Sequence, residues 1–190
     1  MMPTPSFLEE DTPAVLPRRF YARNTAVVGR ELLGKVLRVR DDDVWRSGVI
    51  VEDEAYVDGD PANHAYMGPN RRNGSMFKGP GTVYVYKIHR VNCVNAVTRE
   101  AEAVLIRSLQ PLENASLPTN GPGRLCRALG ITREKHDGLS LTGGEIQIVD
   151  HDFGGVEVGV SERIGITKAR ELALRFFVKN NRFVSRGPRN

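Results

Sequence analysis

The sequence has few of the residues that stabilise small extracellular domains or hold structural metal ions. Its 190 residues include only two cysteines, Cys93 and Cys126, which lie far apart and form no Cys-x-x-Cys pair. This usage argues against a disulfide framework and against a cysteine-ligated zinc site. We therefore expect both cysteines to be small core residues in a reducing compartment.

The sequence also lacks a long apolar segment. No uninterrupted apolar run approaches the roughly 20 residues that a membrane-spanning helix needs. The first residues, MMPTPSFLEEDTPAVLP, hold acids and prolines in place of the basic end and apolar stretch of a secretory signal. We expect a flexible leader at residues 1–17, one domain at residues 18–190, a monomer without membrane association, and a cytoplasmic location that is nucleoid-associated if the source is bacterial.

Negative charge is missing from one long window, because residues 61–98 contain no aspartate or glutamate. Cationic side chains mixed with aromatic ones suit an anionic polymer that carries flat bases. A basic solvated face would have the same composition, so charge alone leaves both interpretations open. The charged and aromatic residues of the window are Arg71, Arg72, Lys78, Lys87, Arg90, Tyr66, Phe77, Tyr84 and Tyr86.

The hydrophobic pattern predicts many short strands and few helices. Asn24 is a candidate cap for a helix that ends before Gly34, and residues 121–129 enter a second short helix. A strand at residues 82–88 would place Tyr84 and Tyr86 on one face. Irregularly spaced strands with short helices favour an α+β domain. The predicted strands cover residues 35–40, 48–56, 82–88, 93–98, 103–112, 145–150, 157–166 and 173–178, with a hairpin turn at 89–92.

Charged side chains interrupt two otherwise apolar strands. In a regular strand Ile50, Glu52, Glu54 and Tyr56 would share a face, although a carboxylate is costly to bury without a partner. Arg107 is equally out of place in the run AVLIRSL. One ion pair between neighbouring strands would explain both anomalies, either as a structural pair or as part of a functional site.

Strings along most of the chain, from about Asn24 onward, together resemble the alkyladenine DNA glycosylases, also called 3-methyladenine or methylpurine DNA glycosylases. The resemblance implies a monofunctional enzyme that extrudes damaged purines from double-stranded DNA and hydrolyses the N-glycosidic bond, which initiates base excision repair. It also implies one α+β domain with a curved antiparallel sheet, a protruding hairpin that inserts into DNA, and no cofactor or metal. The matching strings are VEDEAY (51–56), His64, NRRNGSMFKGPGTVYVY (70–86), CVN (93–95), LIRSLQPLE (105–113), GPGRLCRALGI (121–131) and RIGI…LRFFV (163–178).

The resemblance assigns a catalytic role to three residues. Glu54 matches the carboxylate that deprotonates the attacking water and stabilises the cationic sugar. Arg107 matches an arginine near the water and the sugar-phosphate, where it helps to keep Glu54 ionised. The backbone carbonyl of Ile164 matches a further ligand of that water.

The resemblance also implies a base-binding pocket. Tyr56 and Tyr86 match the aromatic pair that sandwiches the extruded base, and stacking suits an electron-poor ring. His64 matches a histidine that hydrogen-bonds the base. Asn95 matches an asparagine that clashes with the exocyclic amine of guanine. The sequence does not rank 3-methyladenine, 7-methylguanine, hypoxanthine and ethenoadenine as substrates. It also does not decide whether His64 or water protonates the leaving base.

The DNA-contacting residues depart from the family pattern at the hairpin tip. Family members commonly carry a Tyr-Gly-Met-like tip, whereas this chain has the shorter string His-Arg-Val-Asn at residues 89–92. We expect His89 to be the wedge and Arg90 to contact a phosphate, with a wedge shared with Arg90 or Val91 as the alternative. Arg71 and Arg72 are expected to contact phosphates or to form a solvated pair.

Two other functions fit parts of the sequence. A metal-dependent phosphohydrolase is suggested by the His-Asp pairs at residues 136–137 and 151–152 and by Asp58 and Asp60, although their spacing does not aim them at one ion. A non-catalytic nucleic-acid-binding module would need only the basic, aromatic window. No lysine matches a Schiff-base position, so strand cleavage is not expected.

Overall fold

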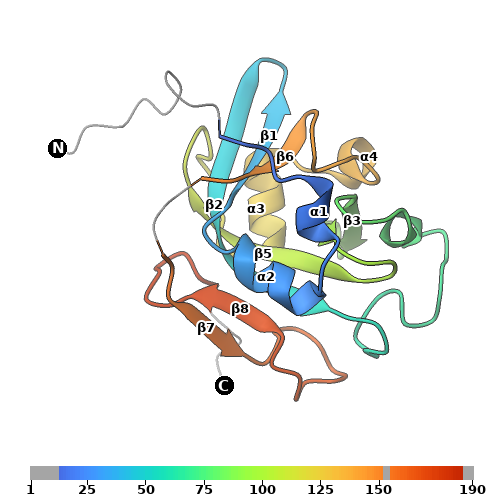
Figure 1. Ribbon diagram of the computed structural model, residues 1–190. Helices are drawn as coiled ribbons and strands as arrows, with labels where there is room; N and C mark the ends of the chain where they lie inside the picture. The colour runs from blue at the N-terminus through green and yellow to red at the C-terminus, as the bar shows by residue number, and fades with distance from the viewer. Residues whose placement is uncertain (1–12, 152–154, 186–190) are drawn as a thin grey trace.

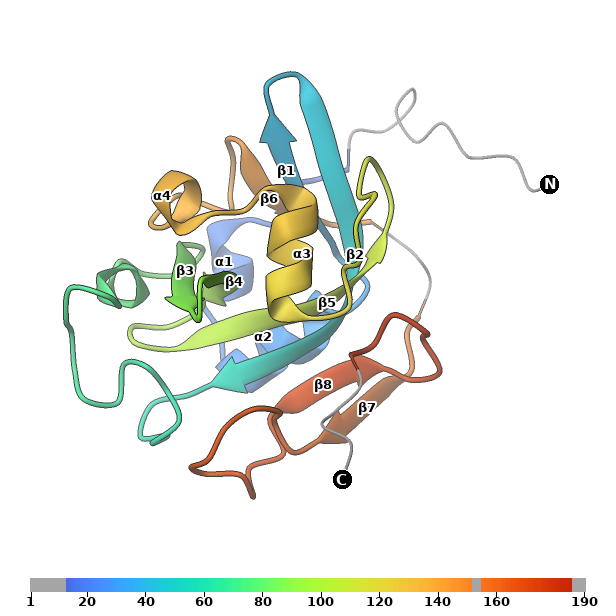
Figure 2. The same ribbon diagram turned by 180° about the vertical axis from the view of Figure 1, so that it is seen from behind.

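The computed structural model describes residues 13–151 and 155–185. Figure 1 and the reverse view in Figure 2 show a curved sheet with short helices on its faces. The order of hydrogen-bonded strands is β3-β4-β5-β2-β1-β6, with β8 paired to β2 and β7 to β8. The elements are α1 Arg18–Tyr21, α2 Thr25–Leu32, β1 Val36–Asp41, β2 Val44–Tyr56, the 3-10 turn η1 Gly74–Phe77, β3 Val83–Ile88, β4 Val91–Val97, β5 Ala103–Pro111, α3 Pro122–Leu129, α4 Arg133–His136, β6 Ile146–Val149, β7 Val158–Ser161 and β8 Arg175–Val178.

All of the described strand pairs are antiparallel. The predicted α+β class, with a curved antiparallel sheet and short helices, is confirmed. α2 and α3 lie on opposite sides of β5 in both views, and their apolar residues belong to one buried core. No helix among the described residues is long and apolar enough to cross a membrane.

β2 is the strand on which the site is built. One of its edges pairs with β5, and its other edge is divided between two partners. Its first half pairs with β1, whereas Glu52, Asp53 and Glu54 pair with β8. Because the strand is covered on both edges and on both faces, all three acidic side chains are fully buried. The carboxylates are therefore exposed to the charges of neighbouring strands rather than to water.

Irregular pairing between β2 and β5 changes which side chains share a face. The register shifts around Val51 in β2 and around Arg107 in β5, so both strands carry a bulge. Ile50 consequently packs in the main core with Ala55. The expectation that Ile50 lies on the face of Glu54 was wrong, because it assumed a regular strand. Glu52 and Glu54 nevertheless share a contact, since both pair with Arg107.

Local sequence explains the helix starts and the aromatic face. The Asn24 side chain accepts hydrogen bonds from the amides of Ala26 and Val27, so it caps α2 as predicted. Tyr84 and Tyr86 belong to a small cluster on one face of β3, while Val83 and Val85 belong to the main core on the other face. The alternation expected for residues 82–88 is therefore confirmed.

Two predicted segments differ from the structure. The strand expected at residues 157–166 ends at Ser161, because the following residues turn toward β2 and the Ile164 amide bonds to Glu54.

Residues 1–12 of the expected leader lie outside the described residues. At its end, Leu16 is buried and its amide donates to the Ile148 carbonyl at 2.9 Å. These last leader residues are therefore packed against β6.

The β3–β4 hairpin has a shorter turn than the four residues expected. Ile88 pairs with Val91, so only His89 and Arg90 form the turn. Both have positive φ, at 47° and 67°, as in the type I′ turns that connect tightly twisted strands. Val91 belongs to β4, and its side chain packs against α3 so closely that a Cβ on Gly123 would lie 1.9 Å from it. Val91 is therefore not part of the tip.

Candidate functional site

A cavity of about 320 Å³ opens beside the end of β2. Its size is within the range of small-molecule sites, which are largely apolar with a few placed polar groups. Six of the predicted site residues line it, and Glu54 lies directly behind three of them. The lining residues are Tyr56, Ala62, Asn63, His64, Met76, Tyr84, Tyr86, Ile88, Cys93, Asn95, Ala103, Leu105, Arg107, Pro122, Ile164, Gly165 and Ile166.

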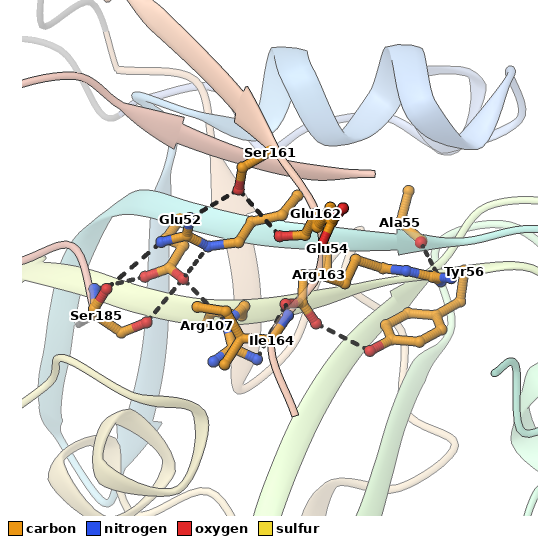
Figure 3. Close-up of polar contacts among 11 residues, drawn as sticks. Glu52, Glu54, Ala55, Tyr56, Arg107, Ser161, Glu162, Arg163, Ile164 and Ser185 are labelled. Atoms are coloured by element: carbon orange, nitrogen blue, oxygen red, sulfur yellow. Dashed lines mark hydrogen bonds and ion pairs between the residues drawn. The ribbon is translucent and has the colours of Figure 1, made fainter. Parts of the chain in front are cut away.

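Glu54 is fully buried and is held by three groups from different elements, as Figure 3 shows. Its Oε1 accepts from the Ile164 amide at 2.7 Å and lies 3.2 Å from Arg107 Nη1. Its Oε2 accepts from the Tyr56 hydroxyl at 2.9 Å. The contact to Ile164 is made by its amide, whereas the resemblance assigned a role to its carbonyl. The carboxylate is thus oriented by hydrogen bonds and by one cation.

Arg107 connects the carboxylates of Glu54 and Glu52. Its Nε donates to Glu52 Oε1 at 3.0 Å while Nη1 pairs with Glu54. Burial lowers the pKa of Arg107, but the charges of Glu54 and Glu52 outweigh burial and leave the pKa raised. The arginine therefore remains a cation at the cavity wall, as the ion pair between neighbouring strands predicted.

Two contacts hold the Tyr56 side chain, one at its hydroxyl and one on its ring. Its hydroxyl donates to Glu54, and the Arg163 guanidinium stacks on its ring with Cζ 4.6 Å from the ring centroid. Arg163 is itself buried, paired with Asp60 and bonded to the Ala55 carbonyl. Burial, followed by the charge and hydrogen bond of Glu54, raises the pKa of Tyr56. Its hydroxyl therefore stays protonated and remains a donor.

His64 lines the cavity next to the tyrosines of β3. Its Nδ1 is 3.0 Å from the Tyr84 hydroxyl, and its ring meets Tyr86 edge to face with centroids 4.4 Å apart. Burial lowers the pKa of His64 below its ordinary value. The imidazole is consequently neutral at pH 7, and it can hydrogen-bond a base more readily than it can donate a full proton.

Asn95 and the two cysteines occupy buried positions. The Asn95 side-chain amide donates to the carbonyls of Tyr84 and Cys93, at 3.0 and 3.3 Å. The amide cannot rotate without breaking both bonds, so it presents a fixed surface to the cavity.

Cys93 and Cys126 are buried free thiols, as expected. Burial raises the pKa of the Cys93 thiol, although Cys93 lines the cavity.

The expected DNA-contacting residues lie outside the cavity. His89 and Arg90 are exposed at the hairpin turn, and Arg71 and Arg72 are exposed in the loop before η1. Arg133 Nη2 donates to the carbonyls of Arg71 and Arg72, which ties this loop to α4. A second cavity of about 260 Å³ borders the first one through His64, Tyr84, Tyr86 and Ile88, and Arg72, Lys87 and Arg133 add positive charge to its lining.

The His-Asp pairs do not form a metal site in the described part of the chain. No group of three or more His, Cys, Asp and Glu residues there has the arrangement to hold an ion. His136 Nδ1 instead contacts the Thr132 backbone, and Asp137 accepts from Ser75 and from the Val85 amide. His151 makes a contact of its own, and Asp152 lies outside the described residues. The ligand geometry required by a phosphohydrolase is therefore not present among these residues.

Several partners of the site were not identified from the sequence. Asp60 and Arg163, which hold Tyr56, stand 103 positions apart, and Glu52 binds Arg175 and Ser185 from the last part of the chain. A glutamate in an apolar strand was the only local signal for the Glu52 contacts. Its partners lie in segments that resemble ordinary strand and loop, so no pattern pointed to them.

Known proteins are similar to this chain over most of its length. The model of the family described as Methylpurine-DNA glycosylase (MPG) matches residues 19–182. A protein of Methanoculleus marisnigri named "Putative 3-methyladenine DNA glycosylase" is 41% identical, over 90% of this chain and 98% of its own length. A protein of the same name from Anaeromyxobacter sp. is 43% identical, over 91% of this chain and 93% of its own length. The chain therefore belongs to the methylpurine-DNA glycosylase family.

Proposed function

We propose that the protein is a monofunctional DNA glycosylase, a hydrolase of N-glycosyl bonds that removes alkylated purines from double-stranded DNA. Its membership of the methylpurine-DNA glycosylase family supports a DNA substrate and this class of reaction. The observation that carries the proposal is the buried Glu54 carboxylate, held by Arg107, Tyr56 and the Ile164 amide at the wall of an aromatic cavity. We place such an enzyme in the cytoplasm, on DNA.

In the proposed reaction Glu54 activates a water that attacks the anomeric carbon of the sugar. The carboxylate takes a proton from the water, the new carbon–oxygen bond forms, and the carbon–nitrogen bond breaks with its electron pair leaving on the base. Each Glu54 oxygen already accepts a hydrogen bond, so the water must share the carboxylate with Tyr56 or displace its hydroxyl. The negative charge of Glu54 also stabilises the cationic sugar.

The aromatic walls suit a flat, electron-poor base. Tyr56 and Tyr86 both line the cavity and would stack on the extruded purine. The fixed Asn95 amide would exclude the exocyclic amine of guanine, because its orientation is locked by two backbone carbonyls. The neutral His64 would hydrogen-bond the base, which leaves water as the source of a proton for neutral lesions. Hypoxanthine and ethenoadenine lack that amine, so we include both as substrates beside 3-methyladenine, whereas 7-methylguanine keeps the amine and is expected to be excised more slowly.

Excision from a panel of duplexes tests the proposed activity. Each duplex carries one lesion, and release of free base is measured with the protein in excess, with and without a chelator. We expect release of at least one alkylated purine, an intact abasic strand and no effect of the chelator. Binding of DNA without base release would favour a non-catalytic module, and loss of activity with the chelator would favour metal-dependent chemistry.

His89 is proposed as the residue that enters the DNA stack, with Arg90 on a phosphate. A type I′ turn favours Asn-Gly, whereas this turn holds two bulky residues at positive φ, which costs stability. Such strain is typical of functional sites, and both side chains are exposed. Arg71 and Arg72 would contact phosphates from the loop that Arg133 holds. Val91 would support the turn through its packing on α3 rather than enter the DNA itself.

Replacing His89 by asparagine tests the wedge. Asparagine tolerates positive φ, so the turn is expected to remain stable while the imidazole is lost. We expect excision from a fully paired duplex to slow about tenfold, and excision from a mismatched duplex to slow less, because a mismatched base costs less to extrude. Single-turnover rates on both duplexes provide the measurement. Equal rates of variant and wild type on both duplexes would remove His89 from the mechanism.

A further inference from the structure

The proposed reaction assigns no role to the buried carboxylate of Glu52. Its Oε1 accepts from Arg107 Nε at 3.0 Å, from Arg175 Nε at 2.8 Å and from Ser185 Oγ at 2.7 Å, and its Oε2 accepts from the Ser185 amide at 2.6 Å. Figure 3 shows this carboxylate between Ser185 and Arg107. Glu52 therefore joins three segments of the chain directly beside Glu54.

The contact to Arg107 fixes the direction in which that guanidinium points. A guanidinium is planar, so a hydrogen bond at Nε restricts where the Nη atoms lie. With Nε held by Glu52, Nη1 lies 3.2 Å from Glu54 Oε1. Arg107 also stands on a strand bulge, where the backbone holds a side chain less uniformly than a regular strand does. The carboxylate of Glu52 supplies the second anchor.

The charges around Glu52 are balanced. Burial raises the pKa of Glu52, but the hydrogen bond from Arg175 and the charges of Arg107 and Arg175 outweigh burial, and the pKa is lowered. Glu52 and Glu54 thus face two guanidiniums, those of Arg107 and Arg175. A neutral side chain at position 52 would leave Arg107 with Glu54 as its one acidic partner among the described residues, and the guanidinium would no longer be fixed at Nε by an ion pair.

We propose that Glu52 is a positioning residue, which orients Arg107 toward Glu54 and fastens the segment around Ser185 to the catalytic strand. This inference rests on the proposed function, since it assigns Glu52 an effect on base excision. The effect would fall on the chemical step rather than on DNA binding, because Glu52 is fully buried and does not line the cavity.

The test compares Glu52→Gln with Glu102→Gln, in which another buried glutamate is changed. Glu102 lies in the β4–β5 turn, where it accepts a hydrogen bond from Thr25, and it makes none of the contacts of the site. We expect Glu52→Gln to lower the single-turnover excision rate by about 10–100-fold, as for other groups that orient reacting residues. Affinity for undamaged duplex should change less than about threefold, and Glu102→Gln should keep the wild-type rate.

A second readout does not depend on activity. This readout is the nitrogen-15 NMR spectrum of the arginine side chains, in which the Arg107 Nε–H signal is assigned by its absence from the Arg107→Lys spectrum. In the wild type we expect the hydrogen of this group to exchange slowly with solvent. This protection should be reduced in Glu52→Gln, because an uncharged amide oxygen accepts the Nε–H bond more weakly than the carboxylate does. If the wild type excises no base, the proposed function fails, whereas this resonance still tests whether Glu52 holds Arg107.

Two further variants keep the inference testable if Glu52→Gln does not fold. Ser185→Ala removes one donor to Glu52 and should slow excision a few-fold, to about the extent expected for one lost hydrogen bond. Glu52→Asp keeps the charge but is shorter, so it should restore only part of the rate. Folded Glu52→Gln or Ser185→Ala protein with wild-type rates and a protected Arg107 Nε–H would overturn the proposal.

Discussion

Changing Glu54 to glutamine is expected to lower the single-turnover rate of base excision by about 10²–10⁴-fold, the usual contribution of a positioned general base. Glutamine has nearly the same shape and can still accept the hydrogen bond from the Ile164 amide. It cannot take a proton from water, and it carries no negative charge to stabilise the cationic sugar. Both losses act on the transition state, so the rate is expected to fall without a loss of DNA affinity.

The fold should survive this change, because Arg107 keeps Glu52 as a buried acidic partner. Thermal unfolding and binding to undamaged duplex should therefore remain close to wild type, and these two measurements separate lost chemistry from lost structure. Glu102→Gln again provides the matched control for a buried glutamate. A Glu54→Gln protein that excises 3-methyladenine within threefold of the wild-type rate would rule out Glu54 as the base.

Changing Asp53 to asparagine is expected to increase the free energy of unfolding at neutral and alkaline pH. Neither carboxyl oxygen of Asp53 has a hydrogen-bond partner among the described residues, and a Cβ on Gly29 would lie 3.1 Å from Asp53 Oδ1. Burial, followed by the charges of Glu54 and Glu52, raises the pKa of Asp53 well above its ordinary value. Asp53 is thus a site where the fold opposes ionisation.

The sign of the pH dependence follows from the raised pKa in the folded state. Well below pH 4 both states are protonated at Asp53, and the group has no effect on stability. As pH rises, the unfolded chain gains by ionising while the folded chain does not, so this group lowers stability until pH passes the folded pKa. Asparagine removes that slope. We expect a gain of about 1–3 kcal/mol at pH 8 and almost none at pH 4.

Urea denaturation at several pH values measures this difference. The exposed Asp58 provides the control, since Asp58→Asn is a surface change and should alter the free energy of unfolding by less than about 0.5 kcal/mol at each pH. If Asp53→Asn differs from the wild type by the same amount at pH 4 and pH 8, then the Asp53 carboxyl ionises alike in both states and the account given for it is incorrect.

Some of the site was predictable because individual residues violated local patterns. Glu54 and Arg107 each interrupted an apolar strand, and one contact satisfies both. Tyr84 and Tyr86 alternated with valines, which fixed their common face. Resemblance to a family supplied the residues that have no such signal, including His64 and Asn95, and both line the cavity.

Other parts depend on long-range pairing that leaves no local trace. The bulges at Val51 and Arg107 contain no glycine or proline, so the pattern predicted regular strands. Ser185 binds Glu52 across 133 positions, and neither neighbourhood indicates the other. The two-residue turn at His89 and Arg90 was also missed, because neither residue is one that such turns favour.

The divided edge of β2 has a consequence for the order in which the molecule is made. Synthesis on the ribosome proceeds from the amino end, so β1, β2 and β5 emerge well before β8 and Ser185. A nascent chain that ends before β8 has the strands of the central sheet, but Glu52 still lacks Arg175 and Ser185. If Glu52 orients the site as we propose, base excision is expected only after the last part of the chain has been added.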